Sequence, residues 1–135
     1  MNEINLPFHL IIPILISMLI LGIFFKKRKQ LFRNGKWQWV WISLTVFFVL
    51  YLLTVGVATY SDIYAQWNLN TFDLDGDGLF GEEERTNEQK AAMQYLINDT
   101  GRNFSFITGF IFSGMIAFFV FALGKTIEVI VTVKK

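Results

Sequence analysis

The chain has no cysteine and only one histidine, His9. Without cysteine it can form no disulfide, no thiolate nucleophile and no cysteine-rich metal site. We find no Ser-His-Asp constellation and no zinc-binding pattern, and His9 is the only histidine that could ligate a haem iron. We therefore expect that the chain is not an enzyme.

Charged residues are missing from three long stretches of the chain. Residues 4–25, 37–60 and 104–124 are almost wholly apolar and contain no Asp, Glu, Lys or Arg. Each is about the length of the roughly 20 apolar residues that span a bilayer. Because backbone polar groups in lipid need internal partners, such isolated spans form helices. The sequence therefore predicts an all-α integral membrane protein with three transmembrane helices, in keeping with 15 phenylalanines and a hydrophobic share of 53%.

The charges that remain are strongly segregated. Residues 26–36 carry six basic residues and no acidic one, whereas residues 61–103 carry nine acidic and three basic residues. Cytoplasmic loops of membrane proteins are enriched in Lys and Arg. We therefore expect the N-terminus outside, the basic loop 26–36 in the cytoplasm, the acidic segment outside, and the C-terminus with Lys134 and Lys135 in the cytoplasm. A plasma membrane or a bacterial inner membrane fits this orientation.

These patterns divide the chain into three parts. Residues 1–60 hold helices 1 and 2 with the basic loop, residues 61–103 form the outer segment, and residues 104–135 hold helix 3 with a short cytoplasmic tail. The first apolar stretch is not a signal peptide, because its basic residues follow the apolar core instead of preceding it. In helix 3, Gly109, Ser113 and Ala117 recur at a spacing of four and predict a face for close helix packing.

The outer segment contains one predicted helix, residues 87–98. Thr86 and Gln89 are spaced as a capping box at its start. Its apolar stripe is formed by Ala92, Met93, Leu96 and Ile97. A segment this short buries too little surface to fold robustly alone, so we expect it to need an ion, the membrane or a partner.

Residues 73–84 read DLDGDGLFGEEE, and this run fits the pattern D-x-[DN]-x-[DN]-G-x5-E at every defined position. It resembles the calcium-binding loop of the EF-hand family. The resemblance implies that Ca²⁺ takes oxygen ligands from loop positions 1, 3, 5, 7, 9 and 12. Leu79 would supply its backbone carbonyl, a water would fill the position of Gly81, and Glu84 would bind through both oxygens. The implied metal ligands are Asp73, Asp75, Asp77, Leu79, Gly81 and Glu84.

The resemblance covers little beyond the loop. Before it, Ala65, Leu69 and Phe72 fall where an entering EF-hand helix has apolar residues, so an EF-hand-like helix-loop-helix between helices 2 and 3 is expected. After it, polar residues occupy exit-helix positions that are usually apolar in the family, and the chain has no second loop. The alternatives are a loop that binds Mg²⁺, which demands tighter octahedral geometry, and an acidic surface loop that binds no ion.

The predicted function is that of a calcium-binding membrane protein that acts as an accessory or regulatory subunit of a larger membrane complex. Calcium would order the outer segment for docking, either as a permanently filled structural ion or as a sensed one. The expected partners are the lipid bilayer and other integral membrane proteins or a second copy of the chain, with no nucleic acid. A calcium-regulated homo-oligomeric channel or transporter is the alternative, with Ser43, Thr45, Thr54 and Ser113 as candidate pore-lining residues.

Overall fold

The computed structural model describes residues 4–33 and 35–133, most of which are helical. No strand occurs among these residues. Three helical segments within them are long and apolar enough to cross a membrane: α1, α2 and the segment that ends in α5. The all-helical prediction with three candidate spans is therefore confirmed. The elements are α1 (Phe8–Leu31), the 3₁₀ turn η1 (Gly35–Trp37), α2 (Gln38–Asn70), α3 (Asn87–Ile97), α4 (Thr100–Asn103) and α5 (Ser105–Val133).

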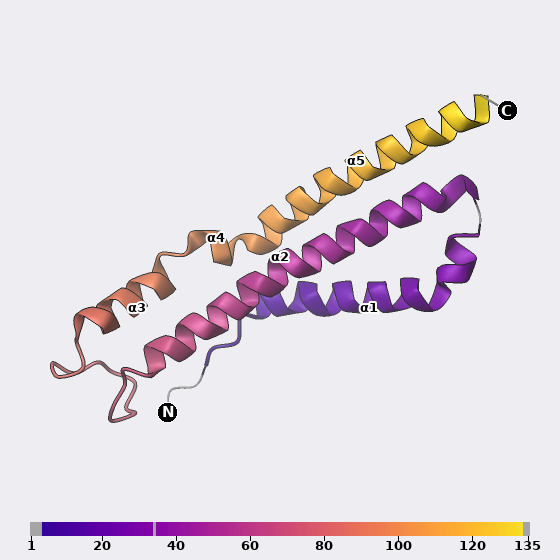
Figure 1. Cartoon of the computed structure of the whole chain (residues 1–135). Coiled ribbons are helices and arrows are strands. Elements are labelled where there is room, and N and C mark those ends of the chain that lie inside the picture. Colours follow the sequence, from indigo (N-terminus) through magenta and orange to yellow (C-terminus); the bar gives the residue numbers. More distant parts are fainter. Residues whose placement is uncertain (1–3, 34, 134–135) are drawn as a thin grey trace.

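The longest helix, α2, lies between α1 and α5 (Figure 1). It packs against both, whereas α1 and α5 contact each other at few points. Leu10 of α1 and Val55 of α2 are fully buried in the hydrophobic core, and Phe106 of α5 packs against them. The Tyr51 hydroxyl donates a hydrogen bond to the Phe106 carbonyl at 3.1 Å. The polar end of the tyrosine therefore has a partner although the ring lies among apolar side chains. The core therefore joins all three long helices near the outer segment.

The small residues of α5 form its contact with α2. Gly109, Ser113 and Ala117 are all buried, as the spacing of four predicts. A Cβ added to Gly109 would lie 3.1 Å from the Thr54 methyl group, so the two helices approach closely there. Small side chains allow this approach and increase the van der Waals contact between helices. The predicted packing face is thus used within the chain.

The basic stretch is more helical than the predicted loop 26–36. Helix α1 does not end with the apolar stretch but continues through Lys26–Lys29 to Leu31. Lys, Arg, Gln and Leu are good helix formers, and cations near a helix C-terminus interact favourably with its dipole. The Arg28 guanidinium also lies 4.8 Å from the centre of the Phe25 ring. The cations therefore occupy the last turns of a helix, and only residues beyond Leu31 connect it to α2.

Helix α2 also runs further than its apolar stretch. It continues past Tyr60 to Asn70, about 15 Å at the usual rise per residue. Tyr64 stacks on Tyr60 and lies against Trp67, which makes an exposed aromatic column on this extension. The opposite side of the extension buries Ala65 and Leu69, and α3 packs against the helix there. The extension thus holds the outer segment beside the bundle. Helix α5, similarly, continues beyond Gly124 to Val133.

Candidate metal centre

Two left-handed glycines shape the loop between α2 and α3. Gly76 has φ of 75° and Gly78 has φ of 88°, a region that residues with a Cβ rarely adopt. The Asp73 carboxylate fixes both turns, since Oδ1 accepts from the Gly76 N–H at 2.9 Å and Oδ2 from the Gly78 N–H at 3.3 Å. The chain therefore folds around the first carboxylate of the loop.

Glu84, the last residue of the loop, closes it. Its Oε1 accepts from the Leu74 N–H at 2.6 Å and its Oε2 accepts from the Gly81 N–H at 2.9 Å. The residue is only 7% exposed. These bonds turn the Glu84 carboxylate inward toward the start of the loop instead of leaving it in solvent.

Three carboxylates meet at this point. One oxygen each from Asp73, Asp75 and Glu84 lie within 4.8 Å of one another. Like charges this close raise each other's free energy unless a cation or hydrogen-bond donors compensate. Backbone N–H groups compensate in part, and hard divalent cations prefer such an all-oxygen donor set. Of the six predicted ligands, the structure thus brings three side chains together.

The other three predicted ligands lie outside this group of carboxylates. Asp77 is exposed, and its Oδ1 accepts from the Leu79 N–H at 2.7 Å. The Leu79 side chain is exposed, in keeping with a predicted role for its carbonyl alone, and the Gly81 N–H is taken by Glu84. Coordination by Asp77, by the Leu79 carbonyl and through a water at Gly81 stays a prediction.

Helix α3 begins where the capping pattern places it. The Thr86 hydroxyl accepts from the Gln89 N–H at 3.1 Å. The backbone N–H of Glu88 and the Thr86 hydroxyl hold the pKa of the Glu88 carboxyl below its ordinary value, which favours its charged form at the helix N-terminus. Of the predicted apolar stripe, Ala92 is buried and Met93 and Leu96 are half-buried. Ile97 was wrongly assigned to it.

The error at Ile97 has a geometric reason. Ile97 follows Leu96 directly, so the two side chains point about 100° apart around a helix of 3.6 residues per turn. Leu96 faces α2 and lines a cavity with Asp62 and Gln66, and Ile97 is left 65% exposed. In the last turn of α3 only one of the two neighbours can share the face of Ala92.

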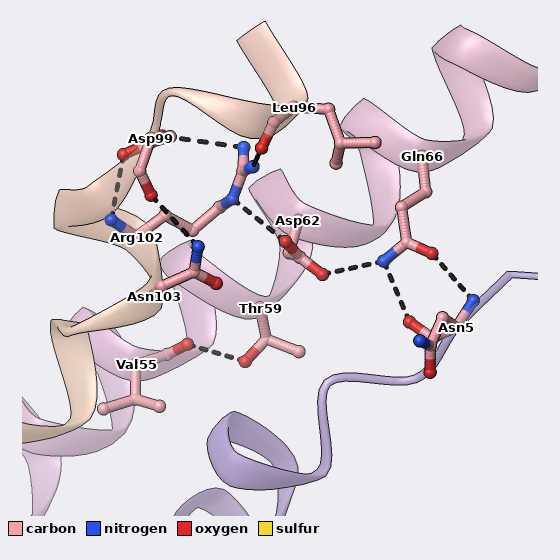
Figure 2. A network of polar contacts seen from close by, with 9 residues as sticks. All are labelled: Asn5, Val55, Thr59, Asp62, Gln66, Leu96, Asp99, Arg102 and Asn103. Atoms are coloured by element: carbon pink, nitrogen blue, oxygen red, sulfur yellow. Dashed lines mark hydrogen bonds and ion pairs between the residues drawn. The ribbon is translucent and has the colours of Figure 1, made fainter. Parts of the chain in front are cut away.

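A second polar cluster, which the sequence did not reveal, joins α4 to α2 and to the last turn of α3 (Figure 2). Arg102 of α4 is 4% exposed, and its Nε lies 3.0 Å from Asp62 Oδ1 of α2. Its Nη1 lies 3.5 Å from Asp99 Oδ2, and its Nη2 donates to the Leu96 carbonyl at 2.8 Å. We call Asp62, Asp99, Arg102 and the Leu96 carbonyl the Arg102 clasp.

The Arg102 clasp reaches the N-terminal end of the described chain through one amide. Gln66 Nε2 donates to Asp62 Oδ2 and to the Asn5 carbonyl, both at 2.8 Å. Gln66 Oε1 accepts from the Asn5 N–H at 2.7 Å. Residues 4–7, which we call the N-terminal strap, are thereby bound to α2 (Figure 2).

One sequence signal could have found the Arg102 clasp. Asp62 is the first acidic residue after the second apolar stretch, and Arg102 is the last basic residue before the third. An acid and a base at the same ends of two neighbouring helices are placed to pair. The pattern is weak by itself, because it does not show which of the other charges of residues 61–103 stay in solvent.

Comparison of the chain with protein-family models, with curated proteins and with solved structures finds no match. The likeness to the EF-hand family therefore remains the loop pattern of residues 73–84.

Proposed function

We propose that the chain is a small calcium-binding integral membrane protein that serves as an accessory or regulatory subunit of a larger membrane complex. The observation that supports an ion site is the close approach of the carboxylates of Asp73, Asp75 and Glu84. They lie in a loop whose backbone turns around Asp73. Their oxygens suit a hard cation that accepts several ligands. Calcium suits this flexible loop better than magnesium, which demands near-octahedral geometry and keeps its waters.

The position of the basic residues supports an outward-facing loop. Lys26–Lys29 lie at the end of α1 that is remote from α3 and the loop (Figure 1). With the basic end in the cytoplasm, as the distribution of Lys and Arg favours, the loop faces the other side of the membrane. Calcium sites of extracellular modules have dissociation constants of about 10⁻⁴ to 10⁻³ M, and we expect a value in this range.

The arrangement of the helices supports a role through a partner. Among the described residues, the buried charged side chains are Asp62, Glu84 and Arg102, and all three lie in the outer segment. Ion relays and coupled transporters place ionisable groups deep within the membrane. The bundle itself offers no such group at its buried positions, so its apolar outer faces are suited to lipid and to other membrane helices.

The channel alternative gains nothing from the candidate pore-lining residues. Ser43 and Ser113 are buried inside the single chain. The hydroxyls of Ser43, Thr45 and Thr54 each donate to the carbonyl four residues earlier in α2. Hydroxyl groups that already donate to their own helix present little polar surface to a pore between copies of the chain.

Calcium titration of the purified chain tests the ion site. We expect Glu84→Gln to weaken calcium binding at least tenfold, because it removes a charge and one carboxylate oxygen from the centre of the loop. Calorimetry in mild detergent measures the heat. Glu83→Gln is the matched control, since Glu83 is exposed and lies outside the group of three carboxylates. Equal heats from the wild-type chain and Glu84→Gln would rule out the loop as the site.

Purification from the native membrane in mild detergent tests the subunit role. With calcium present, we expect the chain to elute together with a larger integral membrane protein. Chelation should weaken that association, because the loop that positions α3 would lose its ion. A chain that elutes alone as a monomer under both conditions contradicts the accessory role, and it leaves the result of the calcium titration untouched.

A further inference from the structure

We propose that the Arg102 clasp couples the docking of α3 to the N-terminal strap, so that the strap is held on α2 only while α3 is in place. The coupling runs through side chains of α4 and α2 and ends on the backbone of Asn5 (Figure 2). Its dependence on calcium rests on the proposed function, whereas the mechanical link between α3 and the strap does not.

The first step of the coupling is the hold of α3 on Arg102. The guanidinium donates to the carbonyl of Leu96, in the last turn of α3, at 2.8 Å. Asp99, two residues after the end of α3, caps α4 by accepting from the Arg102 N–H at 2.9 Å and also pairs with the guanidinium. If α3 moves away from α2, these acceptors move with it, and Arg102 loses the contacts that fix its orientation.

The second step is the hold of Arg102 on Asp62. The Asp62 side chain is 10% exposed and has one oxygen on Arg102 and the other on Gln66. A buried carboxylate that loses its cation is strongly destabilised, so the Asp62 side chain must turn toward water. This rotation removes the Asp62 acceptor that now orients the Gln66 amide.

The third step is the hold of Gln66 on the strap. Its amide makes two hydrogen bonds with the backbone of Asn5, one as donor and one as acceptor. The amide can make both only in one orientation, which Asp62 sets by accepting from the same Nε2. Gln66 is therefore a positioning residue: the orientation of its amide depends on the Asp62–Arg102 pair and determines whether the strap is bound.

The strap borders a cavity that this coupling would control. The cavity has a volume of about 530 Å³ and is lined by residues 5–9, by Asp62 and Gln66 of α2, and by Leu96 of α3. Its walls thus come from the strap and from two elements that the Arg102 clasp joins. Release of the strap would remove one wall of this cavity, which is already open at the surface.

Spin-label distance measurements test the coupling in the full chain. The absence of cysteine allows Ile4→Cys and Trp67→Cys to carry the only two labels, one in the strap and one on the extension of α2. In calcium we expect a narrow distance distribution. Arg102→Met and Gln66→Ala should each broaden it with or without calcium. Lys90→Met, which removes an exposed cation of α3, is the matched control and should leave it narrow.

The outcomes separate this proposal from the proposed function. A narrow distribution in both Arg102→Met and Gln66→Ala overturns the coupling. A broad distribution in Gln66→Ala with a narrow one in Arg102→Met overturns the step through Arg102. Chelation of the wild-type chain should broaden the distribution as the variants do. If calorimetry shows no calcium heat, chelation should change nothing, and the two variants must still broaden the distribution.

Discussion

Asp62→Ala is expected to destabilise the chain by about 3 kcal/mol, because it leaves the Arg102 guanidinium buried without its closest carboxylate. Breaking a buried ion pair by removing one partner typically costs about 3–5 kcal/mol. We expect the lower end of that range, since Asp99 and the Leu96 carbonyl still contact the guanidinium. Reversible unfolding in mixed detergent micelles, followed by circular dichroism, measures the change.

A double substitution distinguishes the cost of an unpaired buried charge from the cost of lost side-chain contacts. Asp62→Leu combined with Arg102→Met should recover most of the lost stability, because apolar residues of similar size often replace a buried pair at little cost. Glu128→Gln is the matched control. It breaks the half-exposed Lys125–Glu128 pair of 2.8 Å, and pairs of this kind contribute about 0–1 kcal/mol. If Asp62→Ala costs no more than Glu128→Gln, the Arg102 clasp does not stabilise the fold.

Gly124→Ala is expected to force α5 away from α2 at the end of the bundle where α2 begins. A Cβ at this position would overlap the indole ring of Trp39, and several atoms of the ring lie in its way. Overpacking of this kind typically costs about 1–3 kcal/mol. The same detergent unfolding measures the loss, and a change in the summed emission of the four tryptophans accompanies displacement of the Trp39 ring.

Gly22→Ala is the matched control for this substitution. Gly22 also lies inside a long helix, and nothing lies within 4 Å of a Cβ added there. Alanine favours helix over glycine by about 1 kcal/mol, so Gly22→Ala should be neutral or stabilising. Trp39→Ala should rescue Gly124→Ala by making room for the methyl group. Equal stability of Gly124→Ala and Gly22→Ala would mean that the indole ring moves aside at no cost.

The sequence predicted those features that local chemistry determines. The capping residue Thr86 located the start of α3, and the spacing of Gly109, Ser113 and Ala117 located the face of α5 that packs against α2. In each case the signal is carried by a few residues close together in the chain. The carboxylates of Asp73, Asp75 and Glu84 were likewise expected together from the loop pattern alone.

Features that depend on contacts between distant segments were missed. The loop resemblance placed Ala65 and Leu69 on a helix before the loop, but hydropathy ends the second span at Tyr60, and the sequence did not show that the two are one continuous helix, α2. The pairing of Asp62 with Arg102 joins residues forty positions apart, and only the positions of the two residues at the ends of neighbouring apolar stretches distinguish them from the exposed charges nearby. The two bonds of Gln66 to the Asn5 backbone span 61 positions and involve a backbone that carries no side-chain signal.

The three long helices stand in a row instead of a triangle, since α2 has a neighbour on each side while α1 and α5 touch little. A row has a longer perimeter than a triangle of the same helices, so more of its surface is available for assembly. A further helix could dock on either flank without displacing α2, which would keep both of its present neighbours. The stoichiometry of a complex would then depend on whether partner helices bind one or both of the flanks formed by α1 and α5.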